Sequence, residues 1–420
     1  MAPAKKTAAA APAPVPAPVS AATPTRLGSL DAYRGMVMIA LAARGFGIHA
    51  ASKNFPDSQL WQTLGYQFEH VSWGGCAFWD LIQPSFMFMV GVSLPFSYAG
   101  RSIQGLSQRQ LTVHAMIRSF VLIFLGVFLA SQSGLVPHYE FFNVLAQIGW
   151  GYTFLFLLWN RPIWLQATAA FTILVAYWAW FAWYPLPPAD FDYTKVGVKP
   201  EYVQNMLTGF PAHWQYYTNP AARFDQWFLN LFPREKPFEF NGGGYTTLNF
   251  VPSLANMIFG LMTGEAIRRT QSKGKLVGGL LICAAVGLAS GWALNYFGLC
   301  PMVKRIWTPG WALFSTGWCW LFLAGFYTII DWLGFRVWAF PLIVAGMNSI
   351  VLYLMGELLR GWTDGLLQRF LGPFTRYFWH CELFDLFGTA YAPLVRNNLI
   401  LLVFWLFVYW LYRQRIFVRI

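Results

Sequence analysis

The sequence predicts an all-α fold, a polytopic transmembrane helical bundle of about ten spans. Hydrophobic residues make up 57% of the 420 residues and charged residues only 11%, whereas a soluble domain carries roughly 25% charged residues. Aromatic residues reach 19%, with 22 tryptophans, which is typical of a protein with aromatic belts at both membrane interfaces. Most of the chain is therefore expected to contact lipid or other apolar helices.

Ten apolar segments have the length of about 20 residues that a helix needs to cross a bilayer. They cover residues 29–49, 77–98, 111–131, 141–160, 163–184, 246–267, 276–297, 309–331, 337–358 and 394–412. The structure of residues 359–393 is left open, since this segment is long enough for a re-entrant segment or an eleventh helix. Ten spans put both termini on one side, and lysine and arginine are more frequent in the segments of that side. We therefore expect cytoplasmic termini and a location in the cell (inner) membrane.

Two long segments lie outside the predicted spans. Residues 1–26 are rich in alanine and proline, a composition that cannot bury apolar surface, so we expect a disordered cytoplasmic tail. Residues 27–420 are expected to form the transmembrane domain, with a long outer loop at 185–245. A loop of this length is more often a lid or a binding element than a simple connection.

The charge and cysteine patterns exclude several classes of protein. The net charge is +12, but the basic residues fall between apolar segments and form no dense patch, so nucleic acid is not expected as a partner. The five cysteines lack a CxxC spacing and the six histidines lack an HxxxH pair. We therefore expect neither a disulfide framework nor a metal site.

The most unusual stretch runs from Phe68 to Val92, where ionisable residues lie at the start of an apolar segment. Glu69 and His70 precede the second span, and Asp80 lies within it. A charged side chain in mid-membrane costs about 2.5–3.5 kcal/mol on insertion scales, so such a residue is a candidate functional group. A neutral imidazole can accept a proton near neutral pH, and a carboxylate can fix its tautomer. The alternative is that Asp80 pairs with an arginine and only holds helices together.

Polar residues recur in other spans. Asp31 and Arg34, one helical turn apart at the start of the first span, are expected to pair. Asn256 and Glu265 lie in the sixth span, and Asn348 lies in the ninth. Polar side chains in a membrane face either neighbouring helices or a wet cavity, and their presence in several spans favours a cavity.

Four motifs are spread along the chain. They are SLDAYRG at 29–35, EHVSWGGCAFWDLIQPSFMFMVGVS at 69–93, NVLAQIGWGY at 143–152 and GMNSIVLY at 346–353. Together they resemble the heparan-α-glucosaminide N-acetyltransferase family and its bacterial relatives. The resemblance implies a multispanning transferase that uses acetyl-CoA from the cytoplasmic side and acetylates an amino sugar on the opposite side. It further implies that His70 matches the catalytic histidine, Asp80 the aspartate of the following span and Asn348 the asparagine of the late motif.

The chain departs from the family pattern in two places. Gly45 and Phe46 stand where the family often has an asparagine pair, and residues 144–149 read VLAQIG where the family has VLQRIA. The missing arginine removes a candidate partner for a phosphate or carboxylate. The sugar acceptor of the mammalian enzyme is therefore not assumed for this chain.

These observations lead to the prediction of a membrane-bound acyltransferase. His70 would act as general base on an amine or hydroxyl of an outward-facing, sugar-like acceptor, or would itself be acylated, and Asn348 would donate a hydrogen bond to the thioester oxygen. The phosphates of acetyl-CoA, the acyl donor, are expected to bind cytoplasmic arginines. The candidates are Arg34, Arg101, Arg109, Arg268 and Arg269.

The rival prediction is a proton-coupled transporter or flippase, in which His70, Asp80 and Glu265 form a proton relay and no covalent step occurs. For the acyltransferase, the expected partners are the lipid bilayer, acyl-CoA and a saccharide or other small-molecule acceptor. A homodimer is left open.

Overall fold

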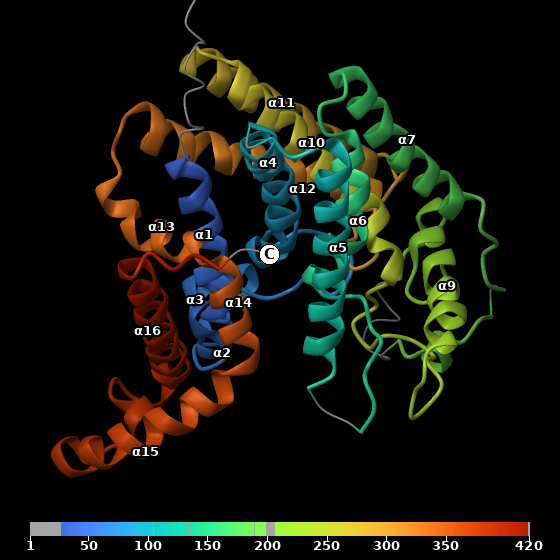
Figure 1. Cartoon of the computed structure of the whole chain (residues 1–420). Coiled ribbons are helices and arrows are strands. Elements are labelled where there is room, and N and C mark those ends of the chain that lie inside the picture. Colours follow the sequence, from blue (N-terminus) through green and yellow to red (C-terminus); the bar gives the residue numbers. More distant parts are fainter. Residues whose placement is uncertain (1–26, 104, 133–134, 189, 199–205, 419–420) are drawn as a thin grey trace, which may run out of the picture.

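The computed structural model describes residues 27–103, 105–132, 135–188, 190–198 and 206–418, which form a bundle of helices (Figure 1). The expected tail at 1–26 lies outside them. Within these ranges the only extended pairing is the isolated bridge between Gly74 and Val303. The predicted all-α class is confirmed.

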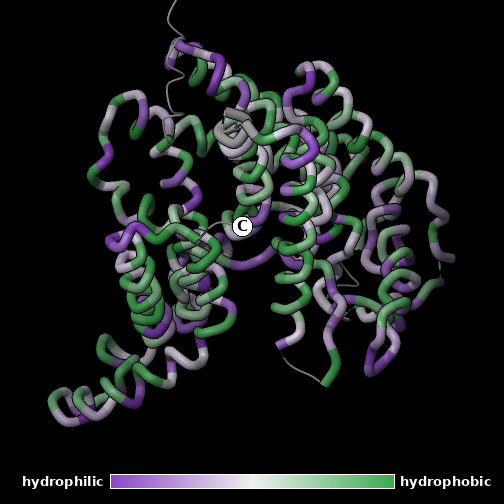
Figure 2. Tube along the Cα trace, in the orientation of Figure 1, coloured by the Kyte–Doolittle hydropathy of each residue, from purple (hydrophilic) through white to green (hydrophobic). Residues whose placement is uncertain are grey.

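The long helices follow the predicted spans in order. They are α1 (Gly28–Ala42), α4 (Ile82–Ile103), α5 (Gln108–Ala130), α6 (Val144–Leu158), α7 (Ile163–Ala182), α10 (Phe250–Arg269), α11 (Lys273–Tyr296), α12 (Pro309–Phe326), α13 (Phe340–Met347), α14 (Ser349–Leu358) and α16 (Ala392–Arg413). Shorter elements connect them: α2 (Ile48–Ser52), α3 (Gln59–Gln67), η2 (Phe78–Leu81), α9 (Pro220–Phe228) and η6 (Thr247–Asn249). Figure 2 shows apolar residues predominating along helices such as α5.

The chain is a multi-pass membrane protein, but the number of ten spans is not confirmed. Among the described residues, seven helices are long and apolar enough to cross a membrane, or nine if two bent pairs each count as one span. The bends are 53° between Ala42 and Gly45 and 69° between Met347 and Ser349. The segment predicted at 141–160 contains α6, which has only 15 residues.

The region 359–393, left open by the sequence, contains a further helix, α15 (Arg360–Trp379). It is not among the candidate spans. In Figure 1 it lies crosswise at the lower margin, on the face of the bundle that also carries α2, α3 and α9. We call this the lower face and the opposite one, where α1 and α11 begin, the upper face.

Glycines allow the central helices to approach each other closely. A Cβ atom at Gly35 of α1 would overlap the carbonyl oxygen of Leu342 in α13, and one at Gly346 would overlap that of Asp31. Gly260 and Gly264 of α10 have the same relation to the backbone of α4. Close backbone contact through small residues is the usual way in which membrane helices pack, because lipid provides no hydrophobic drive between them.

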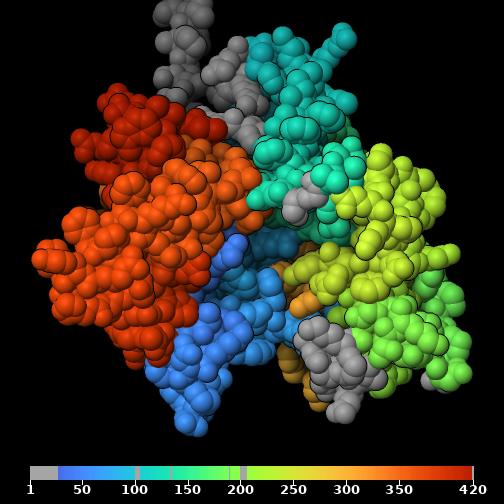
Figure 3. All heavy atoms as spheres, turned by 90° about the horizontal axis from the view of Figure 1, so that it is seen from below, coloured from blue at the N-terminus to red at the C-terminus, as the bar shows by residue number. Residues whose placement is uncertain are grey.

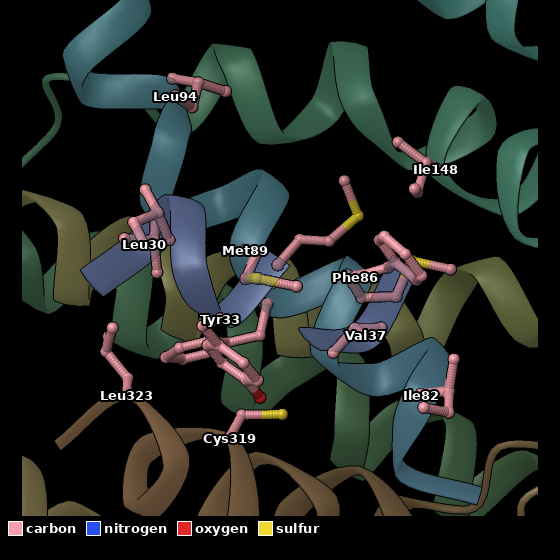
Figure 4. Packing of buried hydrophobic residues seen from close by; sticks show 14 of the residues in the cluster. Leu30, Tyr33, Val37, Ile82, Phe86, Met89, Leu94, Ile148, Cys319 and Leu323 are labelled. Atoms are coloured by element: carbon pink, nitrogen blue, oxygen red, sulfur yellow. The ribbon is translucent and has the colours of Figure 1, made fainter. Parts of the chain in front are cut away.

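Some polar side chains inside the bundle bond to neighbouring segments and do not face a cavity. The Asn256 amide nitrogen donates to the Thr316 hydroxyl at 2.7 Å, and its oxygen accepts from the Trp307 indole at 2.9 Å. The expectation that Asn256 faces a cavity is therefore wrong. In the core shown in Figure 4, the Tyr33 hydroxyl, which lies beside Cys319, donates to the Ser85 hydroxyl at 2.8 Å.

The glycine contacts predict a selective loss of stability. Gly35→Val or Gly264→Val should lower the midpoint of thermal unfolding in detergent, because overpacking costs about 1–3 kcal/mol or more. Gly278→Val on α11 is the control, since a Cβ there meets nothing within 4 Å. Equal midpoints for all three variants would show that the close helix contacts do not carry stability.

Candidate functional site

His70 and Asp80 are in direct contact. The chain turns back after α3, and Asp80 lies in η2 at the entrance to α4. His70 Nδ1 is 2.7 Å from Asp80 Oδ1, and Asp80 Oδ2 accepts from the backbone amides of Ala77 at 3.1 Å and Val71 at 3.4 Å. The Asp80 residue is only 1% exposed, whereas 34% of the His70 side chain is exposed. The carboxylate is thus a buried support for an imidazole that reaches solvent.

Lys304 is the third member of this site, and the sequence analysis missed it. Its ammonium nitrogen lies 3.1 Å from His70 Nδ1 and 3.5 Å from Asp80 Oδ1, and the residue is 4% exposed. It comes from the short connection between α11 and α12, 234 positions along the chain from His70. One signal was available: Lys304 and Arg305 are adjacent cations in a loop on the predicted outer side, where such pairs are disfavoured.

Backbone contacts hold the two loops of the site together. Gly74 forms an antiparallel bridge with Val303, and the amide of Gly75 donates to the Met302 carbonyl at 2.9 Å. The Arg305 guanidinium donates to the carbonyls of Val71 at 3.3 Å and Gly243 at 2.6 Å. The position of Lys304 relative to His70 is therefore fixed by several independent contacts.

The segment predicted as a long outer loop at 185–245 packs onto the His70 loop. The Trp73 ring stacks on Tyr216 with ring centroids 3.6 Å apart, and its indole donates to the Trp214 carbonyl at 3.1 Å. Tyr216 in turn donates to the Ser72 carbonyl at 2.6 Å. This segment thus supports the site from one side.

The charges around His70 favour its neutral form. Burial lowers the pKa of His70 below the usual 6.5, the Lys304 and Arg305 charges lower it further, and Asp80 opposes them. An ionised carboxylate only accepts hydrogen bonds, so Nδ1 carries the proton toward Asp80 and Nε2 keeps a lone pair. In this tautomer, Lys304 stabilises the carboxylate and does not hydrogen-bond to Nδ1.

A large cleft of about 1380 Å³ opens beside His70 on the lower face. One wall comes from the α1–α2 break and the His70 loop, and the other from α14, α15 and the start of α16. The ionisable residues in its lining are Arg44, His49, Glu69, His70, Glu357, Arg360, Asp364, Arg376, Glu382, Asp385 and Arg396. Figure 3 shows this face from below, with a recess near its centre that is bordered by the orange C-terminal part, the blue N-terminal part and the teal and yellow-green middle part of the chain. The lining suits a polar ligand rather than a purely apolar one.

Glu69 pairs with a different histidine from the one with which the sequence analysis grouped it. Its carboxylate is 2.8 Å from His49 Nε2, and His49 Nδ1 is 3.2 Å from the Gly65 carbonyl oxygen. His49 follows the bend after α1, which brings it back to the end of α3. Asp80 is thus the carboxylate that contacts His70, and His49 with Glu69 forms a second polar pair in the cleft.

The arginines expected to bind the donor belong to the upper ends of the helices. Arg34 approaches Asp31 at 3.4 Å, as expected, and donates to the Ser93 hydroxyl at 2.6 Å. Arg268 donates to the Pro95 carbonyl at 3.2 Å, and Arg269 pairs with Glu265 at 3.0 Å. Arg109 is exposed at the start of α5, and the side chain of Arg101 lies outside the described part of the structure. None of the four described side chains lines the cleft.

Asn348 and Glu265 both have partners away from His70. Asn348 occupies the break between α13 and α14, where its amide donates to the Ile416 carbonyl and accepts from the Val418 amide, both at 3.0 Å. Glu265, near the end of α10, accepts from the Gln166 amide at 3.1 Å. Within the described part of the chain, no group of three or more His, Cys, Asp or Glu side chains could hold a metal ion.

Fold and site together define a multi-pass helical membrane protein with a histidine and an aspartate at a polar cleft on one face. The chain is 23% identical to human heparan-alpha-glucosaminide N-acetyltransferase over 449 residues, covering 95% of this chain and 60% of the human protein. It is 26% identical to the mouse heparan-alpha-glucosaminide N-acetyltransferase over 162 residues, or 39% of this chain and 20% of the mouse protein. No protein-family model matches the chain.

The chain is a distant relative of the heparan-alpha-glucosaminide N-acetyltransferase family. This confirms the resemblance seen in the motifs. The chain spans less than two thirds of the length of the relatives it matches.

The site predicts a change in His70 protonation when Lys304 is replaced. In Lys304→Met the pKa of His70 should rise, because a cation that opposes the imidazolium is removed; in Asp80→Asn it should fall. The measurement is the rate of diethylpyrocarbonate modification of His70 against pH, read by peptide mass spectrometry. Modification of the exposed His114 in the same samples controls for the activity of the reagent.

Lys304→Arg is the conservative variant, because it keeps the positive charge. The pKa of His70 in this variant should stay close to that of the parent. An unchanged midpoint of the curve of His70 modification rate against pH in Lys304→Met would show that Lys304 does not act on the imidazole electrostatically.

Proposed function

We propose that the protein is a membrane-bound acyltransferase that moves an acetyl or acyl group from acyl-CoA to an amine or hydroxyl of a saccharide bound in the cleft. The observation that carries the proposal is the His70–Asp80 pair, whose partly exposed imidazole lines a large polar cleft in a membrane protein. The names of the relatives support the acetyl group and the amino-sugar acceptor. The candidate spans among the described residues support a multi-pass membrane location, for which we propose the inner membrane with cytoplasmic termini.

In the proposed reaction His70 Nε2 acts as the general base. It takes a proton from the acceptor amine as the nitrogen attacks the thioester carbonyl; the new C–N bond forms, the C–S bond breaks and CoA leaves as a thiolate. Asp80 holds the imidazole and stabilises the imidazolium that forms. Lys304 disfavours that imidazolium, which promotes return of the proton to the leaving thiolate. In the alternative route Nε2 attacks the thioester first, the C–S bond breaks and CoA leaves as a thiolate; the acceptor amine then attacks the acyl carbon, the bond to Nε2 breaks and the proton of the amine goes to the thiolate.

The donor would bind from the upper face through Arg34, Arg101, Arg109, Arg268 and Arg269. Arg268 contacts Pro95, 15 positions along the chain from Asp80, and at 1.5 Å per residue Pro95 is about 22 Å along the helix from Asp80, the partner of His70. The acyl arm would therefore have to reach through the bundle to the cleft. Guanidinium groups suit this role because they bind phosphate with several parallel hydrogen bonds.

The proposed oxyanion role of Asn348 has weaker support than the role of His70. Both polar atoms of its amide are already bonded to residues 416 and 418. A hydrogen bond to the thioester oxygen would require this C-terminal contact to open. We therefore assign Asn348 first to the junction of α13, α14 and the C-terminal segment.

The transporter alternative needs a relay from His70 through Asp80 to Glu265. Asn249 of η6 is close to the site, because its side-chain amide donates to the Arg305 carbonyl. Glu265 is 16 positions farther along the chain, a separation of about 24 Å along the helix. Its partners are Arg269, Gln166 and the backbone amide of Asn160, near the upper face. These contacts favour a structural ion pair for Glu265 over a place in the relay.

Acetyl transfer by the purified protein is the primary test. With labelled acetyl-CoA and a panel of amino sugars, the parent should transfer label to an acceptor amine. His70→Ala should lose at least about 100-fold in kcat/KM, the usual contribution of a general base. His114→Ala, which removes an exposed histidine of α5, should transfer as the parent does.

Failure of the parent to bind acetyl-CoA in calorimetry would contradict the proposal and favour the transporter. A correctly folded His70→Ala variant with full activity would contradict the role of His70 alone.

A further inference from the structure

Helix α15 separates the cleft from the surroundings of the protein. It follows directly after Leu358, the end of one bent candidate span, and the chain returns to another candidate span at Thr389. Both ends of α15 are therefore tied to membrane helices at the same boundary. Figure 1 shows the helix lying crosswise to α16 at that level.

One row of α15 residues faces the cleft. Five of the α15 residues that line the cleft follow a spacing of four, as expected for one helix face: Arg360, Asp364, Gln368, Gly372 and Arg376; Gly361 and Trp362 at the start of the helix line it as well. Two contacts fix this face against the bundle. The Arg360 guanidinium donates to the Ala42 carbonyl at 2.8 Å, and Arg396 of α16 donates to the Asp364 carboxylate at 2.9 Å.

A second row on the same helix is apolar and uncovered. Phe370, Phe374 and Phe378, again four apart, are 68%, 60% and 64% exposed, and Tyr377 and Trp379 beside them are exposed as well. At about 100° per residue, the centres of the two rows, Gln368 and Phe374, are about 120° apart around the helix. The polar and the aromatic row therefore point to different environments.

Lipid is the occupant that fits the aromatic row. The chain runs from α15 into the candidate span Thr389–Arg413, in which Leu402, Leu406 and Trp410 are also exposed, as lipid-facing residues would be. Phenylalanine, tyrosine and tryptophan together with arginine are typical of a helix that lies in the plane of the membrane interface. α15 does not qualify as a span, so its apolar side is not explained by crossing the bilayer.

We infer that α15 lies in the membrane interface, and that the cleft it walls takes a saccharide attached to a membrane lipid as acceptor. This inference rests on the proposed acyltransferase function. A sugar head group anchored in the same interface would be held at the depth of the cleft entrance, and confinement of this kind raises effective concentration without any new contact. The same sugar free in solution would lack that advantage.

The test compares two acceptors in proteoliposomes supplied with labelled acetyl-CoA: an amino-sugar glycoside of a long-chain alcohol and the methyl glycoside of the same sugar. For the parent, kcat/KM should be at least about tenfold higher for the long-chain glycoside. Replacing Phe370, Phe374 and Phe378 together by serine should bring this ratio close to one and leave the methyl glycoside rate unchanged. The control replaces Phe120, Phe124 and Phe128 of α5, which have the same spacing and are also exposed, and should keep the ratio.

A second measurement does not depend on activity. A spin label at position 374 should be accessible to oxygen and shielded from a water-soluble nickel reagent, and a label at 368 should show the reverse. A water-accessible label at 374, or cross-linking at 374 between two copies of the chain, would overturn the membrane placement. If neither glycoside is acetylated, the proposed function fails; if both are acetylated equally well by the parent, only the lipid-linked acceptor is ruled out.

Discussion

The burial of the Asp80 carboxylate is the constraint on which the site depends. Removing a carboxylate from water costs several kcal/mol even after relaxation, so the charge must be met by hydrogen bonds and an opposite charge. In this protein the partners come from three segments: His70 and Val71 after α3, Ala77 at the entrance of η2, and Lys304 between α11 and α12. The acid therefore ties together parts of the chain that are more than 200 positions apart, and each partner depends on the others for its position.

The same arrangement gives the imidazole its chemical character. With Asp80 on Nδ1 and Lys304 close to both, His70 is held as a neutral base whose other nitrogen is left for a ligand, and burial lowers its pKa in the same direction. The cleft brings His70 to one face of the bundle, whereas the described arginines proposed for the donor belong to the other. This separation suits a reaction between a donor from one side of the membrane and an acceptor on the other. Helix α15 has its polar row on the cleft and its aromatic row exposed, and in the proposed reaction it would control how the acceptor reaches His70.

Composition and hydrophobic length were sufficient to predict the helical membrane fold, and the unusual acid in the second span drew attention to Asp80 and His70, which the structure places in contact. Periodicity cannot predict contacts between distant loops, which is why Lys304 was missed and Glu69 was grouped with His70 when it pairs with His49. The bend after α1 depends on Arg44 and Phe46 adopting a left-handed conformation that is unusual for residues other than glycine. The exact number of spans could not be predicted because α6 is short and two spans are bent, one of them at Asn348, whose amide is used by the C-terminal segment.

The central claim is that acyl transfer takes place at His70 Nε2 in the cleft. The most direct measurement is an experimental structure of the full chain in a lipid nanodisc with a non-hydrolysable acetyl-CoA analogue bound. The account predicts that the acyl group lies in the cleft beside His70, with room for one acceptor nitrogen that is about 3 Å from Nε2 and about 3.5 Å from the acyl carbon, and that the phosphates lie at the arginines of the upper face. An analogue whose acyl group lies outside the cleft, away from His70, would contradict it.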